Sequence, residues 1–266
     1  MTVSHSGYVA LDIGGTKLAA AMVTVDGSVV ISDRVPTPTR DPWSAVAALV
    51  SRVIAATPDV EPLALGAGCG GPMERGGETV SPLHIPAWRG FPLRSSLREL
   101  VDLPVAVDND AKALALGEGW LGAAKGLGNY MAVVIGTGVG AGLVVGGHLI
   151  DGGSGNAGHL GHVIVEEGGL VCRCGAHGCL EAYLSGSAIE TRTGQSARQS
   201  SSATMVDAGR RFGRAVASVA ALTSIERVVV AGSVALGWGD EFFMSARDEF
   251  GARSRLSFTQ SIDIVP

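Results

Sequence analysis

The chain has 266 residues, of which 46% are hydrophobic and 17% charged, and its formal net charge is −5. This length suffices for one large hydrophobic core or two smaller ones. The acidic balance and the lack of a dense Lys/Arg run argue against nucleic acid or an anionic membrane as the main partner. The segment that precedes the first predicted strand is short and polar, unlike a signal peptide. No uncharged apolar run reaches the roughly 20 residues that span a bilayer. We therefore expect a cytoplasmic protein.

Strand and helix signals alternate along the chain as in an α/β protein. We predict, in chain order, strands over 9–13, 18–25 and 28–34, a helix over 41–57, strands over 63–67 and 105–110, a helix over 111–120, strands over 130–135 and 141–145, a helix over 205–222 and a strand over 227–230. The polar stretch 187–202 indicates a surface connection or a weak helix. A lobe boundary is expected between residues 111 and 125, with a smaller lobe over 1–115 and a larger one over 116–266.

Asp12 lies at the end of the first strand and precedes the turn Gly14-Gly15-Thr16-Lys17. Glycines let backbone N–H groups approach a polyphosphate, Thr16 can donate a hydroxyl, and Asp12 can hold Mg²⁺ through water. The pattern is not a P-loop, because no helix follows a Gly-Lys-Ser/Thr sequence. An ordinary hairpin turn is the alternative interpretation.

Two further glycine turns follow strands. The segment Ile135-Gly136-Thr137-Gly138-Val139-Gly140 repeats the strand, hydroxyl and glycine pattern of the first hairpin. Two such hairpins, each opening one half of the chain, indicate duplicated phosphate-binding turns. The turn at Gly232 can pack its backbone against an adenine or ribose, or it can be a routine connection between a strand and a helix.

The strand over 105–110 ends in Asp108, Asn109 and Asp110. Phosphoryl transfer to an alcohol requires a base that takes the hydroxyl proton, and a carboxylate at a strand end can serve. Asp110 is the candidate base and Asn109 a candidate partner for neighbouring hydroxyls. The alternative is that these residues only cap the following helix.

Three cysteines, Cys172, Cys174 and Cys179, lie within eight residues, shortly after His159 and His162. A cysteine cluster in a chain without an export signal is more often metal-binding than disulfide-bonded. Three thiolates and one imidazole suit a closed, tetrahedral, structural zinc site. His162 is the preferred histidine ligand, and His159 and His177 are the alternatives.

In their order, these motifs resemble the ROK family of bacterial sugar kinases and repressors. The resemblance covers nearly the whole chain and rests on the first hairpin, on Asn109-Asp110-Ala111, on the second hairpin, and on Gly158-His-Leu-Gly-His162 with Cys172-x-Cys174-Gly-x-x-Gly-Cys179-x-Glu181. It implies a two-lobed α/β fold of the actin-like ATPase type (hexokinase-type, ribonuclease H-like), with Mg-ATP and sugar in the interlobe cleft.

The resemblance also implies residue roles. Asp110 would be the catalytic base, and the sugar contacts would come from Gly71, Asn109, Asp110, His159, His162 and Glu181. Zinc would be held by His162, Cys172, Cys174 and Cys179, so that His162 binds metal through one ring nitrogen and sugar through the other.

Three departures from the family pattern bear on these roles. Family glucokinases usually carry Glu where this chain has His159, whereas bacterial N-acetylmannosamine kinases resemble it there. An asparagine that relatives often place after the Gly71 turn is replaced by Ser81-Pro-Leu-His84. Relatives also continue past Pro266 into a glycine- and alanine-rich helix that packs on the first lobe.

The sequence therefore predicts a kinase that uses ATP to phosphorylate a hydroxyl, expected to be primary, of a hexose or N-acylhexosamine, with N-acetylmannosamine and glucose as first candidates. A cyclitol kinase and a non-catalytic, sugar-responsive regulator are the alternatives, and polyphosphate could replace ATP as donor. The family repressors carry a helix-turn-helix ahead of Asp12, for which this sequence leaves no room. A homodimer is expected from the resemblance alone.

Overall fold

The computed structural model describes residues 5–266, which fall into two compact units. Unit 1 consists of the residues up to 113 together with 151–156, and unit 2 consists of 114–150 and 157–266. The change from one unit to the other thus lies within helix α3 (Asp110–Trp120). The predicted larger lobe, 116–266, includes the segment 151–156, which here belongs to unit 1. The lobe boundary between residues 115 and 116 stays a prediction.

Unit 1 is built on a five-stranded sheet in the order β3-β2-β1-β4-β5. Its strands are β1 (His5–Ile13), β2 (Lys17–Thr24), β3 (Val29–Pro36), β4 (Val60–Cys69) and β5 (Val105–Asn109). The first three form an antiparallel meander, while β4 and β5 run parallel to β1. The carboxyl ends of β1, β4 and β5 therefore meet at one edge of the sheet.

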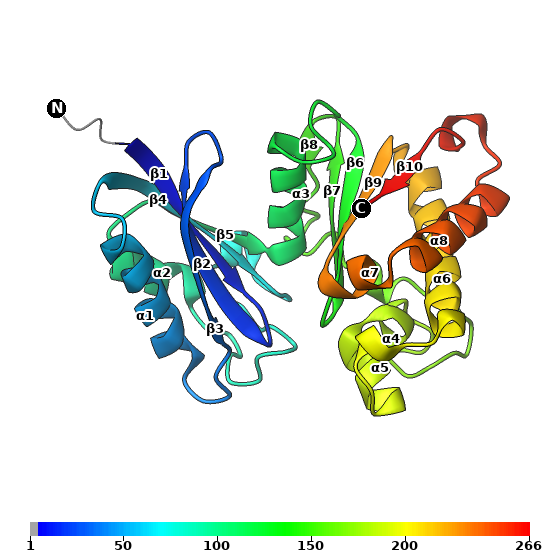
Figure 1. The fold of residues 1–266 in the computed structure, drawn as a ribbon, viewed down its shortest axis with the longest axis horizontal. Helices are drawn as coiled ribbons and strands as arrows, with labels where there is room; N and C mark the ends of the chain where they lie inside the picture. Colours follow the sequence, from blue (N-terminus) through cyan, green and yellow to red (C-terminus); the bar gives the residue numbers. More distant parts are fainter. Residues whose placement is uncertain (1–4) are drawn as a thin grey trace. The chain divides into compact units, whose positions relative to one another are not determined.

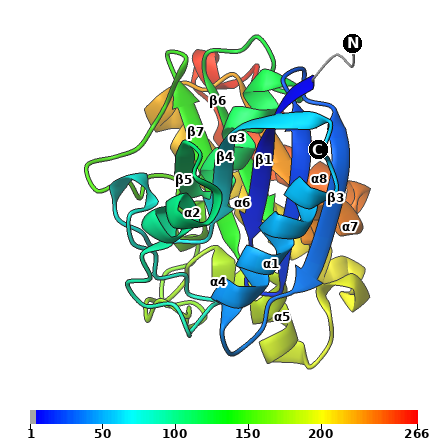
Figure 2. The same ribbon diagram turned by 90° about the vertical axis from the view of Figure 1, so that its left-hand side faces the viewer.

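Two helices complete the core of unit 1. Helix α1 (Pro42–Ala55) contacts β1, β2 and β3, as Figure 2 shows, and α2 (Leu93–Val101) contacts β5. Helix α1 begins where Asp41 accepts a hydrogen bond from the Ser44 backbone N–H. Its apolar face, with Val46, Leu49 and Val53 fully buried, packs on the sheet. A single 3₁₀ turn, Arg75–Gly77, precedes α2.

Unit 2 repeats the sheet topology of unit 1. Its strands β6 (Tyr130–Ile135), β7 (Val139–Val145), β8 (His148–Leu149), β9 (Arg227–Ala231) and β10 (Asp263–Val265) form a sheet in the order β10-β9-β6-β7-β8. Strands β6, β7 and β8 form an antiparallel meander, and β9 and β10 continue it in parallel, as β4 and β5 do in unit 1. Each half of the chain thus opens with an equivalent hairpin.

The helices of unit 2 are α4 (Glu181–Leu184), α5 (Gly186–Thr193), α6 (Ser202–Thr223), α7 (Ser233–Trp238) and α8 (Asp240–Arg253). Short 3₁₀ turns occupy Leu160–His162, Ala197–Gln199 and Ser257–Thr259. Helices α6 and α8 lie side by side near β9 and β10 (Figure 1). A Cβ atom at Gly213 would lie 2.3 Å from the Ala246 carbonyl oxygen, so the helices approach closely because this position carries no side chain.

The predicted α/β fold class is confirmed, and the predicted strands and helices recur with small shifts at their ends. The polar stretch after residue 186 contains the short helix α5 and one 3₁₀ turn. The sequence did not predict the helices α2, α4, α7 and α8 or the strands β8 and β10. No helix within residues 5–266 combines the length and apolarity that crossing a membrane requires.

The change in burial along β4, from its exposed first half to its buried second half, yields a stability prediction. Leu65 is fully buried in the core of unit 1, whereas Leu63, two positions earlier, is 40% exposed. Leu65→Ala should lower the free energy of unfolding by about 2–5 kcal/mol, because it removes buried methyl groups and leaves a cavity. Leu63→Ala is the matched control and should cost below about 1 kcal/mol. Urea unfolding measures both, and equal losses would contradict the placement of Leu65 in the core.

Candidate functional site

Polar residues of unit 1 gather where its parallel strands end. The register pairs Asp12 of β1 with Gly68 of β4, and Gly68 with Asp108 of β5. The next row joins Ile13, Cys69 and Asn109. Ligands of open α/β sheets bind outside such carboxyl ends. The topology thus brings residues almost 100 positions apart in sequence to one edge.

Asp110 follows this row as the first residue of α3 and lies against Gly68. A Cβ atom on Gly68 would lie 3.3 Å from the Asp110 Cα, so a side chain there would crowd the start of α3 at Asp110. Burial raises the pKa of Asp110, and the negative charge of Asp12 raises it further, although a hydrogen bond from the Ala111 backbone N–H opposes both. Such a raised pKa is typical of a carboxyl group that exchanges a proton during a reaction.

The Asp12 carboxylate is open to solvent but surrounded by protein atoms on its other sides. Desolvation raises its pKa, and the nearby positive charge of Lys17 partly offsets that effect. Between the two aspartates, burial and their charges raise the pKa of the Cys69 thiol, which stays protonated and unreactive. Asp12 and Asp110 therefore lie at this edge together with Asp108, which is paired with Lys112 at 3.3 Å.

The first glycine turn joins β1 to β2 and is fixed from two sides. The Gly14 N–H donates to the Lys17 carbonyl at 3.0 Å, and the Thr37 hydroxyl donates to the Gly14 carbonyl at 2.7 Å. The Thr37 N–H also donates to the Thr16 carbonyl at 3.1 Å. A Cβ atom on Gly15 would lie 2.3 Å from the Cβ of His84, so the 81–88 loop approaches this turn closely.

The second glycine turn joins β6 to β7 and is held by the start of α5. The Gly186 N–H donates to the Gly136 carbonyl at 2.8 Å, and the Ser187 hydroxyl donates to the Thr137 carbonyl at 2.7 Å. Gly138 completes the turn, and Gly140 already belongs to β7. These contacts occupy the carbonyl groups of the turn and fix its conformation.

Gly232, from the third predicted turn, lies against the second one. Its φ is +102°, and a Cβ atom there would lie 2.3 Å from the Ile135 carbonyl oxygen. Glycine is required on both grounds, backbone conformation and space. The structure thus brings together two of the predicted nucleotide-binding turns within unit 2.

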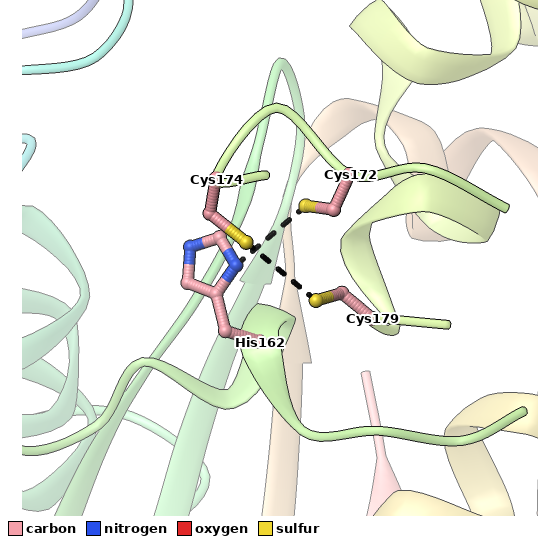
Figure 3. A group of neighbouring side chains, drawn as sticks. All are labelled: His162, Cys172, Cys174 and Cys179. Carbon is pink, nitrogen blue, oxygen red and sulfur yellow. Dashed lines mark hydrogen bonds between the residues drawn. The ribbon is translucent and has the colours of Figure 1, made fainter. Parts of the chain in front are cut away.

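The predicted metal ligands converge in a compact loop of unit 2 (Figure 3). The ligand atoms of His162, Cys172, Cys174 and Cys179 all lie within 4.8 Å of one another. The Cys172 Sγ is 3.7 Å from His162 Nδ1, and the Cys174 Sγ is 3.7 Å from the Cys179 Sγ. In a zinc tetrahedron with bonds of about 2.3 Å, sulfur atoms are about 3.8 Å apart. The spacing and the soft ligand set both fit a tetrahedral zinc ion.

The glycines of this loop are required by its geometry. Gly175 and Gly178 have φ of +92° and +77°, and a Cβ atom on Gly178 would lie 1.7 Å from the Glu166 carbonyl oxygen. The Cys172 N–H donates to the Ala176 carbonyl at 2.8 Å, which closes the tight turn that carries Cys174. The Cys-x-Cys-Gly-x-x-Gly-Cys spacing is therefore a steric requirement of the loop.

His159, His177 and Glu181 lie around this group but outside it. The rings of His159 and His162 are 5.9 Å apart, and His177 contacts the Gly169 carbonyl at 3.2 Å. The Glu181 carboxylate is buried and accepts a hydrogen bond from the Val139 N–H at 2.9 Å. Glu181 thus connects the end of the metal loop to the second hairpin, a contact that the sequence did not reveal.

The predicted sugar contacts are distributed over both units. Gly71, Asn109 and Asp110 belong to unit 1, and His159, His162 and Glu181 belong to unit 2. In unit 1, the Asn109 side chain accepts from the Ala111 N–H at 3.0 Å, and the Gly71 carbonyl accepts from the Leu83 N–H at 3.3 Å. Lys112 was not recognised from the sequence as part of this site. A lone cation in an otherwise apolar helix, four residues after Asp108, could have indicated it.

The model of the ROK family matches residues 8–238. The chain belongs to the ROK family. A glucokinase of Streptomyces coelicolor is 40% identical over 181 residues, which are 68% of this chain and 57% of the relative. An N-acetylmannosamine kinase of Escherichia fergusonii is 36% identical over 252 residues, 86% of this chain and 84% of the relative.

Solved structures of the ROK family share the fold. A glucokinase from Streptomyces griseus, in complex with glucose and AMPPNP, superposes with a TM-score of 0.82 and 28% identity, covering 97% of this chain and 93% of that one. The predicted actin-like ATPase fold is thereby confirmed. The chain spans about 57% of the length of the first Streptomyces relative.

The cysteine cluster predicts a metal-dependent fold for the loop. Cys179→Ser should abolish stoichiometric zinc binding and lower the melting temperature of the protein, because a structural metal contributes its binding free energy to folding. Cys69→Ser is the control, since Cys69 lies in unit 1 and outside the cluster. It should retain about one zinc ion per chain by plasma emission spectrometry. A Cys179→Ser protein that kept its full zinc content would contradict the ligand assignment.

Proposed function

We propose that this ROK protein transfers a phosphoryl group from Mg-ATP to a hydroxyl, expected to be the primary one, of a hexose or N-acylhexosamine. The observation that carries the proposal is the pair formed by Asp12 and Asp110 at the ends of β1 and β5, with the pKa of Asp110 raised by burial and by Asp12. The kinases among its relatives support the choice of reaction.

Asp110 is the proposed general base. A carboxylate with a raised pKa accepts a proton from a sugar hydroxyl more readily than an ordinary carboxylate does. Asn109, which precedes it, would accept or donate hydrogen bonds to neighbouring hydroxyls of the sugar. Phosphoryl transfer otherwise depends on positioning and on neutralising charge.

The glycine turns are the proposed phosphate sites. The Gly14 and Gly136 N–H groups close their own turns by donating to the Lys17 and Gly138 carbonyls. The other backbone N–H groups of these turns, Gly15 among them, would face the phosphates, while Thr16, Lys17 and Thr137 add side-chain donors or a cation. Asp12 is placed to hold Mg²⁺ through water, and Gly232 to contact the nucleoside. Mg²⁺ would offset the negative charge that accumulates on the transferred group.

Zinc is the proposed occupant of the His162 and cysteine group, where it would fix the loop and take no part in the reaction. In Figure 3 the Nδ1 of His162 faces the sulfur atoms and the other ring nitrogen lies on the far side of the ring. That nitrogen is the one we assign to the sugar, together with His159 and Glu181. The homodimer and the cytoplasmic location expected from the sequence stay predictions.

Asp110→Asn tests the base. The turnover number should fall at least about 100-fold, since an amide cannot accept the proton, while the sugar dissociation constant changes little. Asp102→Asn is the control, because it removes the same charge from an exposed helix end. Near-normal turnover of the Asp110→Asn enzyme would contradict the assignment.

The Asp110→Asn variant should lose turnover but gain thermal stability at neutral pH. The raised pKa means that ionised Asp110 destabilises the folded state above that pKa, and the penalty disappears as pH falls through it. At pH 7, Asp110→Asn should therefore melt at a higher temperature than the parent protein, with a difference that shrinks toward pH 4. A melting temperature lowered at pH 7 would contradict the desolvated carboxylate.

His159 is the proposed determinant of the sugar. A carboxylate accepts two hydroxyl hydrogen bonds where an imidazole accepts at most one. His159→Glu should raise the ratio of kcat/KM for glucose to that for N-acetylmannosamine by about tenfold. His148→Glu, at an exposed position on β8, adds the same charge and should leave the ratio unchanged. An unchanged ratio in the His159→Glu enzyme would contradict this role.

A further inference from the structure

A lysine in the first turn of α3 is completely enclosed. Lys112 is 1% exposed, and its ammonium group lies 2.6 Å from the Asp151 carboxylate, 2.9 Å from the Gly155 carbonyl oxygen and 3.3 Å from the Asp108 carboxylate. A buried ammonium is tolerated only when such partners replace its water. Two of the three partners belong to the segment 151–156, which the chain returns to unit 1 from unit 2.

Two further side chains hold that segment. The Asn156 amide donates to the Met73 carbonyl at 2.9 Å and accepts from the Met73 N–H at 3.1 Å. The Arg75 guanidinium donates to the carbonyls of Gly152 and Gly153 at 3.1 and 3.4 Å. Every one of these contacts is polar and lies within unit 1.

The segment has little else to order it. Its sequence is Asp-Gly-Gly-Ser-Gly-Asn, residues 151–154 are exposed, and it contains no apolar side chain. Glycine-rich backbone loses more conformational entropy on ordering than any other. Its position therefore depends on the polar contacts, and Lys112 is the one buried charged group among residues 5–266 that contacts it.

The same ammonium also acts on the strand end that carries Asp110. The Asp108 carboxylate accepts a hydrogen bond from the Asn109 N–H at 2.7 Å and is paired with Lys112 from the other side. Lys112 thus connects the backbone from which Asn109 and Asp110 project to a segment that ends three residues before His159.

We propose that Lys112 is a positioning residue that holds the segment 151–156 against unit 1. It thereby fixes both the Asp108–Asp110 strand end and the chain that leads to His159. The prediction on sugar affinity rests on the proposed function. The prediction on the order of the segment does not.

Hydrogen–deuterium exchange of the full chain without ligand tests whether Lys112 holds the segment 151–156 in place. In Lys112→Met, amides of the peptide covering 148–158 should exchange about tenfold faster or more, because the loss of one buried charged partner releases the segment. Asp151→Asn should have a smaller effect, since Lys112 keeps Asp108, and the double variant should exchange no faster than Lys112→Met alone. Lys125→Met, at an exposed position, should exchange as the parent does. Unchanged exchange in Lys112→Met would overturn the proposal.

Calorimetric titration with N-acetylmannosamine and with glucose tests positioning. In Lys112→Met with full zinc content, the dissociation constant of the sugar that the parent binds should rise about tenfold, while the KM for ATP stays within about twofold. If Lys112 only stabilises the fold, its loss would lower the fraction of active protein and leave both the sugar dissociation constant and the KM for ATP unchanged. That result would overturn the positioning role. A parent protein that releases ADP with none of N-acetylmannosamine, glucose, mannose and N-acetylglucosamine would overturn the proposed function. The exchange result would still decide whether Lys112 holds the segment 151–156.

Discussion

The parallel register of β1, β4 and β5 is the constraint on which the candidate site depends. It places Asp12, Gly68 and Asp108 in one row, and Asp110 directly follows. The absence of a side chain at Gly68 leaves room for Asp110, and burial, reinforced by the charge of Asp12, raises the pKa of Asp110. Strand pairing therefore brings the proposed base, Asp110, and the proposed magnesium ligand, Asp12, to the same edge, although the two are far apart in sequence.

Unit 2 repeats this topology but uses it differently. Its hairpin turn is fixed by α5 and by Gly232, and the buried Glu181 links that hairpin to the metal loop. The loop itself contains little apolar surface around Cys174, so its shape depends on glycine conformations and on the ligand group. The zinc ion proposed for this position would stabilise the loop, because a structural metal contributes its binding free energy to folding.

Much of this architecture was accessible from the sequence. Apolar periodicity located the strands other than β8 and β10 and the helices α1, α3 and α6, and the cysteine spacing predicted a ligand group that the structure brings together. Helix α8 was not predicted because the buried Phe242 and Phe243 are followed directly by the exposed Met244, which blurs the apolar pattern. The roles proposed for Asp110 and His159 stay predictions.

The contacts of Lys112 could not be predicted, for a physical reason. A lysine in a helix is usually solvated, and only the return of 151–156 to unit 1 encloses it. Such tertiary contacts between a helix and a distant glycine-rich segment leave no periodic signal. The same holds for Glu181 and Val139, which are 42 residues apart.

The most direct test of the central claim is a coupled ADP-release assay with Mg-ATP across N-acetylmannosamine, glucose, mannose, N-acetylglucosamine and a cyclitol, with zinc content measured on the same sample. The account predicts turnover on at least one hexose or N-acylhexosamine by the zinc-containing protein. Zinc-containing protein that binds one of these sugars but releases no ADP with any of them would contradict it.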